Sequence, residues 1–157
     1  MSMRLHFLNV GNGDCTIIEL PDGNLMMVDI CNGGGTNRRL TDPIRYLGTR
    51  RSLFRYVQTH PDMDHMDGLS LLEPKCTIIN FWDTANTKPR PDFSSPYSKG
   101  KQADWDAYQR LRSGAKHYYR SLSPVTLQGG GQFPYELFVL HPTEQAVRDA
   151  NRTGEWN

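Results

Sequence analysis

The chain has 157 residues, a length that fits one domain around a single hydrophobic core and excludes two ordinary domains. Hydrophobic residues make up 37% and charged residues 22%, which is typical of soluble globular proteins and excludes a disordered or membrane-spanning chain. Lys and Arg number 18 against 17 Asp and Glu, and the net charge of +1 excludes the overall basic field of many nucleic-acid-binding proteins.

Cysteine usage and the N-terminus indicate the compartment. The three cysteines, Cys15, Cys31 and Cys76, are odd in number and form no CxxC pair, which argues against a disulfide framework and a cysteine-rich zinc finger. The segment MSMRLHFLNV lacks the charged start and long apolar stretch of a signal peptide. We therefore expect a cytoplasmic protein with no membrane segment.

The first thirty residues predict a β-meander. Residues 4–10, 15–20 and 25–30 are rich in apolar and β-branched side chains, and residues 11–14 and 21–24 between them are turn-forming. In the second turn proline presets the backbone and glycine accepts a positive φ, which favours a tight hairpin.

Helices and strands alternate in the next part of the chain. Asp42 and Pro43 are typical of a helix start, so a helix is expected over 43–50. Residues 53–59 predict a strand, 68–72 a short helix and 77–81 a buried strand.

A long exposed insertion is expected at 83–101, a stretch rich in Pro, Ser and Lys. A helix is predicted over 102–120, a strand over 136–140 and a helix over 143–150. The apolar stripe of the 102–120 helix is expected to pack in the core and consists of Trp105, Tyr108, Leu111, Ala115 and Tyr118. This order of elements predicts a layered α/β or α+β fold of one domain over residues 1–157.

One hexapeptide concentrates metal ligands. His60, Asp62, Asp64 and His65 supply two imidazoles and two carboxylates directly after a predicted strand. Imidazole combined with carboxylate suits Zn, Mn or Fe. The sequence therefore predicts a metal site in the loop that begins at His60.

This hexapeptide resembles the H-x-[H/D]-x-D-H signature of the metallo-β-lactamase superfamily. Its context THPDMDHMDG is similar to the branch that contains the hydrolase domain of the bacterial DNA-uptake channel protein ComEC. The segment LNVGNGDCTIIELPDGNLMMVDI is similar to the opening pattern of that branch, with Asn12 at a usual Gln and Asp29 at the superfamily's aspartate near the metals. The resemblance implies that Asp29 contacts the metal-binding side chains without binding the metal itself. It also suggests His141 in VLHP as a further metal ligand.

The resemblance implies a four-layered αββα sandwich, of which this chain would carry the N-terminal half to two-thirds. The second half of that fold supplies a Gly-Asp strand end and a last histidine, and neither is found after His141. A further C-terminal segment or a homo-oligomer is expected to complete the fold and to cover the apolar surface that is otherwise left.

The activity implied by the resemblance is metal-dependent hydrolysis of phosphodiesters, with DNA as the leading substrate. Two divalent ions, Zn or Mn, would bind water for attack, one ion held by His60 and Asp62 and the other by Asp64 and His65. Asp64 would also have the catalytic role of orienting that water. The nucleic-acid backbone would follow a cluster of arginines: Arg38, Arg39, Arg45, Arg50, Arg51 and Arg55.

Other interpretations of the same residues stay open. The metal signature is equally compatible with hydrolysis of another ester, a thioester or an amide, and the incomplete fold also fits a non-catalytic metal-binding or assembly module. The hexapeptide could simply cap a strand-to-helix turn. An EF-hand is disfavoured because Met66 and Asp67 occupy positions that need a ligand and a glycine. His141 is as easily a hydrogen-bonded residue at a strand end as a ligand.

Overall fold

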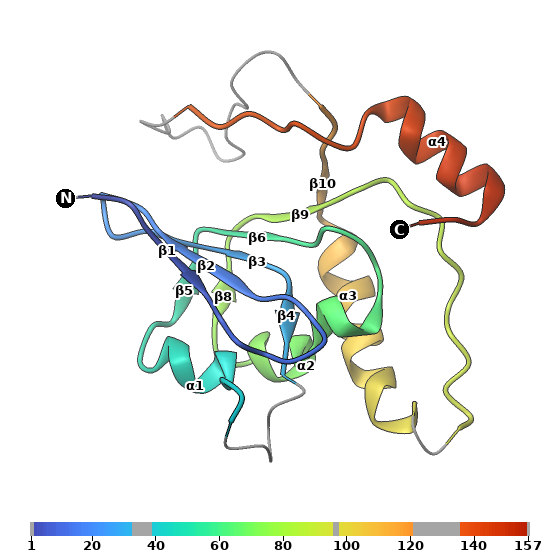
Figure 1. The fold of residues 1–157 in the computed structure, drawn as a ribbon. Coiled ribbons are helices and arrows are strands. Elements are labelled where there is room, and N and C mark those ends of the chain that lie inside the picture. The colour runs from blue at the N-terminus through green and yellow to red at the C-terminus, as the bar shows by residue number, and fades with distance from the viewer. Residues whose placement is uncertain (1, 33–38, 96–97, 121–135, 157) are drawn as a thin grey trace.

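A mixed β-sheet of six strands is the centre of the fold (Figure 1). The computed structural model describes residues 2–32, 39–95, 98–120 and 136–156. In this part of the chain, the strand order is β1-β2-β3-β6-β9-β10. The strands β1, β2 and β3 pair antiparallel, and β6, β9 and β10 continue the sheet from β3 in parallel. The six strands are Arg4–Phe7 (β1), Thr16–Glu19 (β2), Leu25–Val28 (β3), Arg55–Val57 (β6), Phe81–Asp83 (β9) and Lys116–His117 (β10).

The predicted β-meander and its turn are confirmed. The Leu20 N–H donates to the Asn24 carbonyl at 2.9 Å, and Asp22 accepts from the Asn24 N–H at 3.0 Å. Gly23 has a φ of 86°, the left-handed conformation for which the turn needs a glycine. This turn sets the register of β2 against β3.

Two short parallel pairs lie beside the main sheet. β4 (Ile30–Cys31) pairs with β7 (Met66–Asp67), and β5 (Ser52–Leu53) pairs with β8 (Thr77–Ile78). Ile30 is aligned with Met66. The β4–β7 pair therefore brings together the residues that precede each strand, Asp29 and His65.

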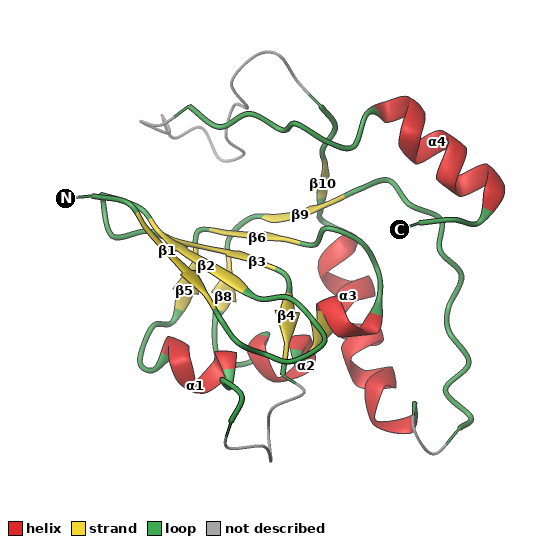
Figure 2. Cartoon of the chain, viewed as in Figure 1, coloured by secondary structure: helices red, strands yellow, loops and turns green. Residues whose placement is uncertain are grey.

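Three of the four described helices lie on one side of the sheet, and the fourth lies apart from them, next to the chain that follows β9 (Figure 2). The short η1 turn belongs to the loop after β6. No helix in the described ranges has both the length and the apolar character needed to cross a membrane. The helical elements are α1 (Pro43–Leu47), η1 (Met63–His65), α2 (Leu69–Leu72), η2 (Lys99–Lys101), α3 (Gln102–Arg112) and α4 (Glu144–Thr153).

The core lies between the sheet and the helices on its one side. The strand register aligns the buried side chains of Ile17, Met27, Tyr56 and Phe81 across four strands. Aligned residues of neighbouring strands share a face of the sheet. The ring of Tyr108 on α3 lies 6.2 Å from that of Phe81, so α3 packs on this face.

The predicted helices differ mainly in where they end. α1 begins as expected, with Asp42 accepting the Arg45 N–H at 3.0 Å, but it ends at Leu47 because Gly48 reverses the chain with a φ of 60°. The prediction of one helix over 102–120 is wrong beyond Arg112. Strand pairing with β9 replaces the helical hydrogen bonds there, because β9 offers a free edge to β10.

The predicted strands also differ in two places. The 77–81 strand is divided into β8 and β9, because Asn80 between them bonds the Phe54 carbonyl with its side chain at 2.7 Å. The prediction of a strand over 136–140 is wrong, since this segment has no partner strand among the residues that the structure describes. Its side chains alternate between exposed and half-buried, which explains its strand-like pattern.

Residues 84–95 after β9 are irregular, as expected of an insertion, and the predicted segment ends in η2, but it is not exposed throughout. Asp83, Thr84, Asn86 and Phe93 are buried. The prediction of an exposed segment from its polar composition is therefore wrong for these residues. Their polar side chains are buried because they bond one another and α3 inside the fold.

Candidate metal centre

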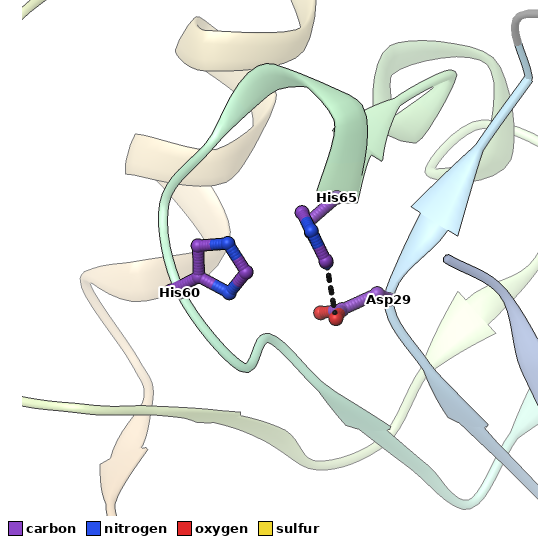
Figure 3. Close-up of side chains that lie close together, drawn as sticks. All are labelled: Asp29, His60 and His65. Carbon is purple, nitrogen blue, oxygen red and sulfur yellow. Dashed lines mark hydrogen bonds and ion pairs between the residues drawn. The ribbon is translucent and has the colours of Figure 1, made fainter. Parts of the chain in front are cut away.

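The loop after β6, residues 58–65, brings the two motif histidines together. We call it the histidine loop. Its η1 turn folds the chain back, and the ring centroids of His60 and His65 lie 3.8 Å apart (Figure 3). A carboxylate oxygen of Asp29 and one ring nitrogen of each histidine lie within 4.8 Å of one another. The three side chains come from two loops at the same end of the sheet.

Asp29 is buried behind the histidines and accepts four hydrogen bonds. Its exposed fraction is 1%, and its φ of 53° lies in the left-handed region, where a non-glycine residue is uncommon. One carboxylate oxygen accepts from the Thr59 N–H at 2.8 Å and the Gln58 side chain at 3.3 Å. The other accepts from the Thr59 hydroxyl and from His65 Nδ1, the latter at 2.8 Å. Both oxygens are thus already engaged, and Asp29 is better suited to orient His65 than to bind an ion.

These bonds determine the tautomer of His65. A carboxylate only accepts, so Nδ1 must carry the proton, and in the neutral ring Nε2 keeps its lone pair for a metal. The hydrogen bond to Asp29 raises the pKa of His65, although burial opposes the shift.

His60 is oriented by the same carboxylate through Thr59. The Thr59 hydroxyl gives its proton to Asp29 and lies 3.0 Å from His60 Nδ1, so it accepts the Nδ1 proton of His60. Nε2 of His60 is then free to bind a metal, like that of His65. Burial and the neighbouring His65 lower the pKa of His60, which favours the neutral ring.

Each histidine has an aspartate of the motif as its neighbour. Nε2 of His60 lies 3.8 Å from a carboxylate oxygen of Asp62, and Nε2 of His65 lies 3.8 Å from one of Asp64. In a tetrahedral zinc site, bond lengths of about 2.0–2.2 Å separate adjacent ligand atoms by about 3.4 Å. The two pairs are within a few tenths of an ångström of that spacing, and both consist of donors that Zn or Mn accepts.

A lysine that no sequence motif indicates lies at this site. The ammonium group of Lys88 bonds the second carboxylate oxygen of Asp62. Its side chain is only 23% exposed, and burial lowers its pKa. Nothing in the 83–101 segment distinguishes this lysine from its neighbours, because the contact joins residues 26 positions apart.

The residues before Lys88 are held by a buried carboxylate. We call residues 84–88 the lysine loop. Asp83 has no exposed surface and bonds Arg112 Nε at 2.7 Å, the Tyr108 hydroxyl at 2.8 Å and the Thr84 N–H at 2.8 Å. Burial raises the pKa of Asp83 to about 6, so the group is ionised at neutral pH.

Helix α4 holds the same loop from the other side. The Asn151 amide donates to the Ala85 carbonyl at 2.9 Å, and its oxygen accepts from the Thr87 N–H at 2.8 Å. The lysine loop is therefore fixed at both of its sides, and Lys88 reaches Asp62 from a rigid backbone.

Gly13 belongs to the turn expected at 11–14 and packs against the motif. A Cβ at this position would overlap the Asp64 carbonyl oxygen and the Cys31 side chain. The backbone of the loop at 11–14 therefore packs directly against the histidine loop. Asp14 in this loop, whose side chain is 76% exposed, lies 3.8 Å from His65 Nδ1.

His141 lies on the wall of a cavity that also includes His60. The cavity has a volume of about 630 Å³ and extends from the histidine loop to α4. His141 does not belong to the cluster of ligand atoms within 4.8 Å that the described residues form. Its role as a ligand stays a prediction.

The predicted arginine cluster does not form one basic face at the metal centre. Arg55 is completely buried, with its guanidinium 3.7 Å from the centre of the Trp82 ring. Arg45 and Arg51 line a different cavity, next to α1 and α2. Arg38 lies outside the described residues. The prediction failed because the arginines come from separate elements, and Arg55 of β6 points its side chain into the interior instead of into solvent.

Comparison with known proteins adds no family assignment. No protein-family model matches the chain, and no curated protein matches it either. What the chain does must therefore be argued from its side chains.

Proposed function

We propose that the protein is a divalent-metal-dependent hydrolase that cleaves phosphodiesters. The observation that carries this proposal is the pairing of each histidine Nε2 with a motif carboxylate at 3.8 Å. His60 and Asp62 would hold one ion, and Asp64 and His65 the other. Zn or Mn bound there would lower the pKa of a water molecule and polarise the phosphoryl oxygens.

The protein's own side chains would orient the reactants. Asp29 holds His65 directly and His60 through Thr59, so the ligands are fixed before an ion binds. Asp64 is half exposed and can accept a hydrogen bond from the attacking water. Lys88 brings a positive charge to the side of Asp62, where it can bind a phosphate oxygen.

The fold that we propose for the complete site is the four-layered αββα sandwich. Its support is the second face of the sheet, where apolar residues continue opposite the helix-covered core. Ile18 and Met26 are aligned on this face, and Leu5 of the edge strand is aligned with Ile18 and is 48% exposed. A sheet that is apolar on both faces calls for a second layer. A further segment of chain or a second copy would supply it. All three cysteines are buried, and no disulfide joins them to one another, which supports the proposed cytoplasmic location.

Metal analysis and a phosphodiester assay test the function. The purified protein should bind up to two Zn or Mn ions and hydrolyse bis(p-nitrophenyl) phosphate when loaded. His60→Ala and Asp64→Asn should each lose at least one ion and most activity, since each removes a ligand.

His6→Ala is the matched control, because His6 lies on β1 at the far edge of the sheet. This variant should keep both metal and activity. A protein that binds no divalent ion, or that binds equally well without His60 and Asp64, would contradict the proposal. Metal binding without any hydrolysis would favour a non-catalytic module.

A further inference from the structure

The cavity between the metal centre and α4 has the size and position of a substrate pocket. Its volume of about 630 Å³ is in the range of small-molecule sites, and Thr59 and His60 belong both to its wall and to the metal centre. The opposite wall is α4, and Thr84 and Asn86 of the lysine loop form a third side. Whatever binds in this cavity therefore has one end at His60.

Two aromatic rings line the cavity with their polar atoms already bonded elsewhere. The Tyr118 hydroxyl donates to the Gln58 carbonyl at 3.1 Å, and Trp156 Nε1 donates to the Asn151 side chain at 2.9 Å. A ligand in the cavity would thus meet the faces and edges of these rings. Val147 and Ala150 of α4 add apolar surface next to them.

The charges of the wall disfavour a phosphate in the cavity itself. No Lys or Arg side chain is among the described residues that line it, whereas Asp149 and Glu155 are, the Asp149 carboxylate being paired with Arg152 at 3.1 Å and the Glu155 carboxylate adding a negative charge. Positive charge lies instead at Asp62, where Lys88 is bonded. An anionic group would therefore stay at the metal centre, and an uncharged group that donates hydrogen bonds would suit the cavity.

From this arrangement we infer that the cavity binds the unpaired nucleobase attached to the phosphodiester that is cleaved. A purine base offers flat faces for the aromatic rings, and its amino group offers a donor for the carboxylates. The inference rests on the proposed function and narrows the substrate to an unpaired nucleotide unit. A base within a duplex would first have to leave the stack to enter a walled pocket.

Binding of adenosine compounds to the full chain tests the inference without any hydrolysis. Adenosine, adenosine 5′-monophosphate and ribose 5-phosphate are titrated calorimetrically, with and without Mn²⁺. We expect adenosine to bind in both conditions, and the monophosphate to bind about tenfold or more tightly than ribose 5-phosphate, because base stacking adds to affinity.

Two pocket variants and one matched control locate the binding. Ala150→Phe fills the cavity from α4, and Trp156→Ala removes one ring, so each should weaken adenosine binding by about tenfold. Arg148→Phe adds the same ring to the exposed side of α4 and should bind like the wild type. The melting temperature of each variant verifies its fold, and Trp156→Ala carries the test if Ala150→Phe unfolds.

The outcomes separate the two proposals. Metal binding at His60 and Asp64 with no preference for the adenosine compounds over ribose 5-phosphate would overturn the pocket and leave the hydrolase. Adenosine binding that both pocket variants weaken, in a protein that binds no metal, would support the pocket and overturn the hydrolase. Adenosine binding that Ala150→Phe and Trp156→Ala do not change would overturn the assignment of this cavity.

Discussion

The histidine loop and the lysine loop follow neighbouring parallel strands of one sheet, yet they are held in different ways. The histidine loop is organised by Asp29, which bonds Thr59 and His65 near the metal centre itself. The lysine loop is organised by Asp83 at the end of β9 and Asn151 of α4. Asp83 accepts from the Thr84 N–H, and Asn151 bonds the backbone of Ala85 and Thr87.

The two carboxylates that organise these loops therefore have different roles. The carboxylate behind the histidine loop orients ligand atoms, so its loss should alter metal affinity first. The carboxylate before the lysine loop pairs with the partly buried Arg112 and bonds the backbone of Thr84, so its loss should alter stability first. Two aspartates with equally little exposed surface thus have separable roles.

The largest expected effect tests the lysine loop. Asp83→Ala leaves Arg112, whose side chain is only 18% exposed, without its carboxylate, so the free energy of unfolding should fall by about 3–5 kcal/mol. Urea denaturation followed by circular dichroism measures the change. Asp92→Ala is the control, because this exposed carboxylate of the same segment bonds the exposed Ser94, and the variant should unfold like the wild type. Equal stability of the two variants would contradict the comparison.

A smaller effect of a different kind tests the histidine loop. Thr59→Val keeps the shape of the side chain but removes the hydroxyl between His60 and Asp29, so metal affinity should fall by about 10–100-fold. Thr59→Ser restores the hydroxyl and should restore the affinity. Competition with a chromogenic chelator measures both. If the valine variant bound metal as tightly as the serine variant, Asp29 would not orient His60 through Thr59.

The smallest expected effect tests the contact between the two loops, the ion pair of Lys88 with Asp62. Lys88→Met removes the positive charge from Asp62, so affinity for the first divalent ion should rise by about tenfold, since like charges repel across a short distance. The KM for a phosphodiester should rise in the same variant because a phosphate contact is lost. Lys75→Met, on an exposed lysine, is the control for both measurements. A lower metal affinity in Lys88→Met would show that Lys88 supports the site by packing instead.

Much of the fold could be predicted from local patterns. The Pro21–Asn24 turn, the Asp42 cap and the Thr143 cap of α4 each depend on residues within four positions of one another. The helix over 102–120 and the strand over 136–140 failed because their states depend on distant partners. β10 forms on a free edge of β9, and the 136–140 segment has no partner strand among the residues that the structure describes.

The candidate site also combines features that depend on nearby residues with features that depend on distant partners. Two histidines and two aspartates within six residues indicate a metal site by composition alone, and the distances between them are short because η1 folds a short loop. The bond from Asp29 to His65 spans 36 residues and exists because β4 pairs with β7. Only the family resemblance places Asp29 behind the metals, and no pattern in the sequence indicates Lys88.

By itself, the amino-acid sequence determined the chemistry of the histidine loop, the turns and caps, and the mixed α/β class, because each depends on residue types at short spacing. Tertiary structure alone decided that Lys88 reaches Asp62, that Arg55 is buried, and that α4 walls a cavity beside His60. These contacts follow from strand order and helix docking, and the energy that selects them is spread over many weak interactions that no short motif encodes.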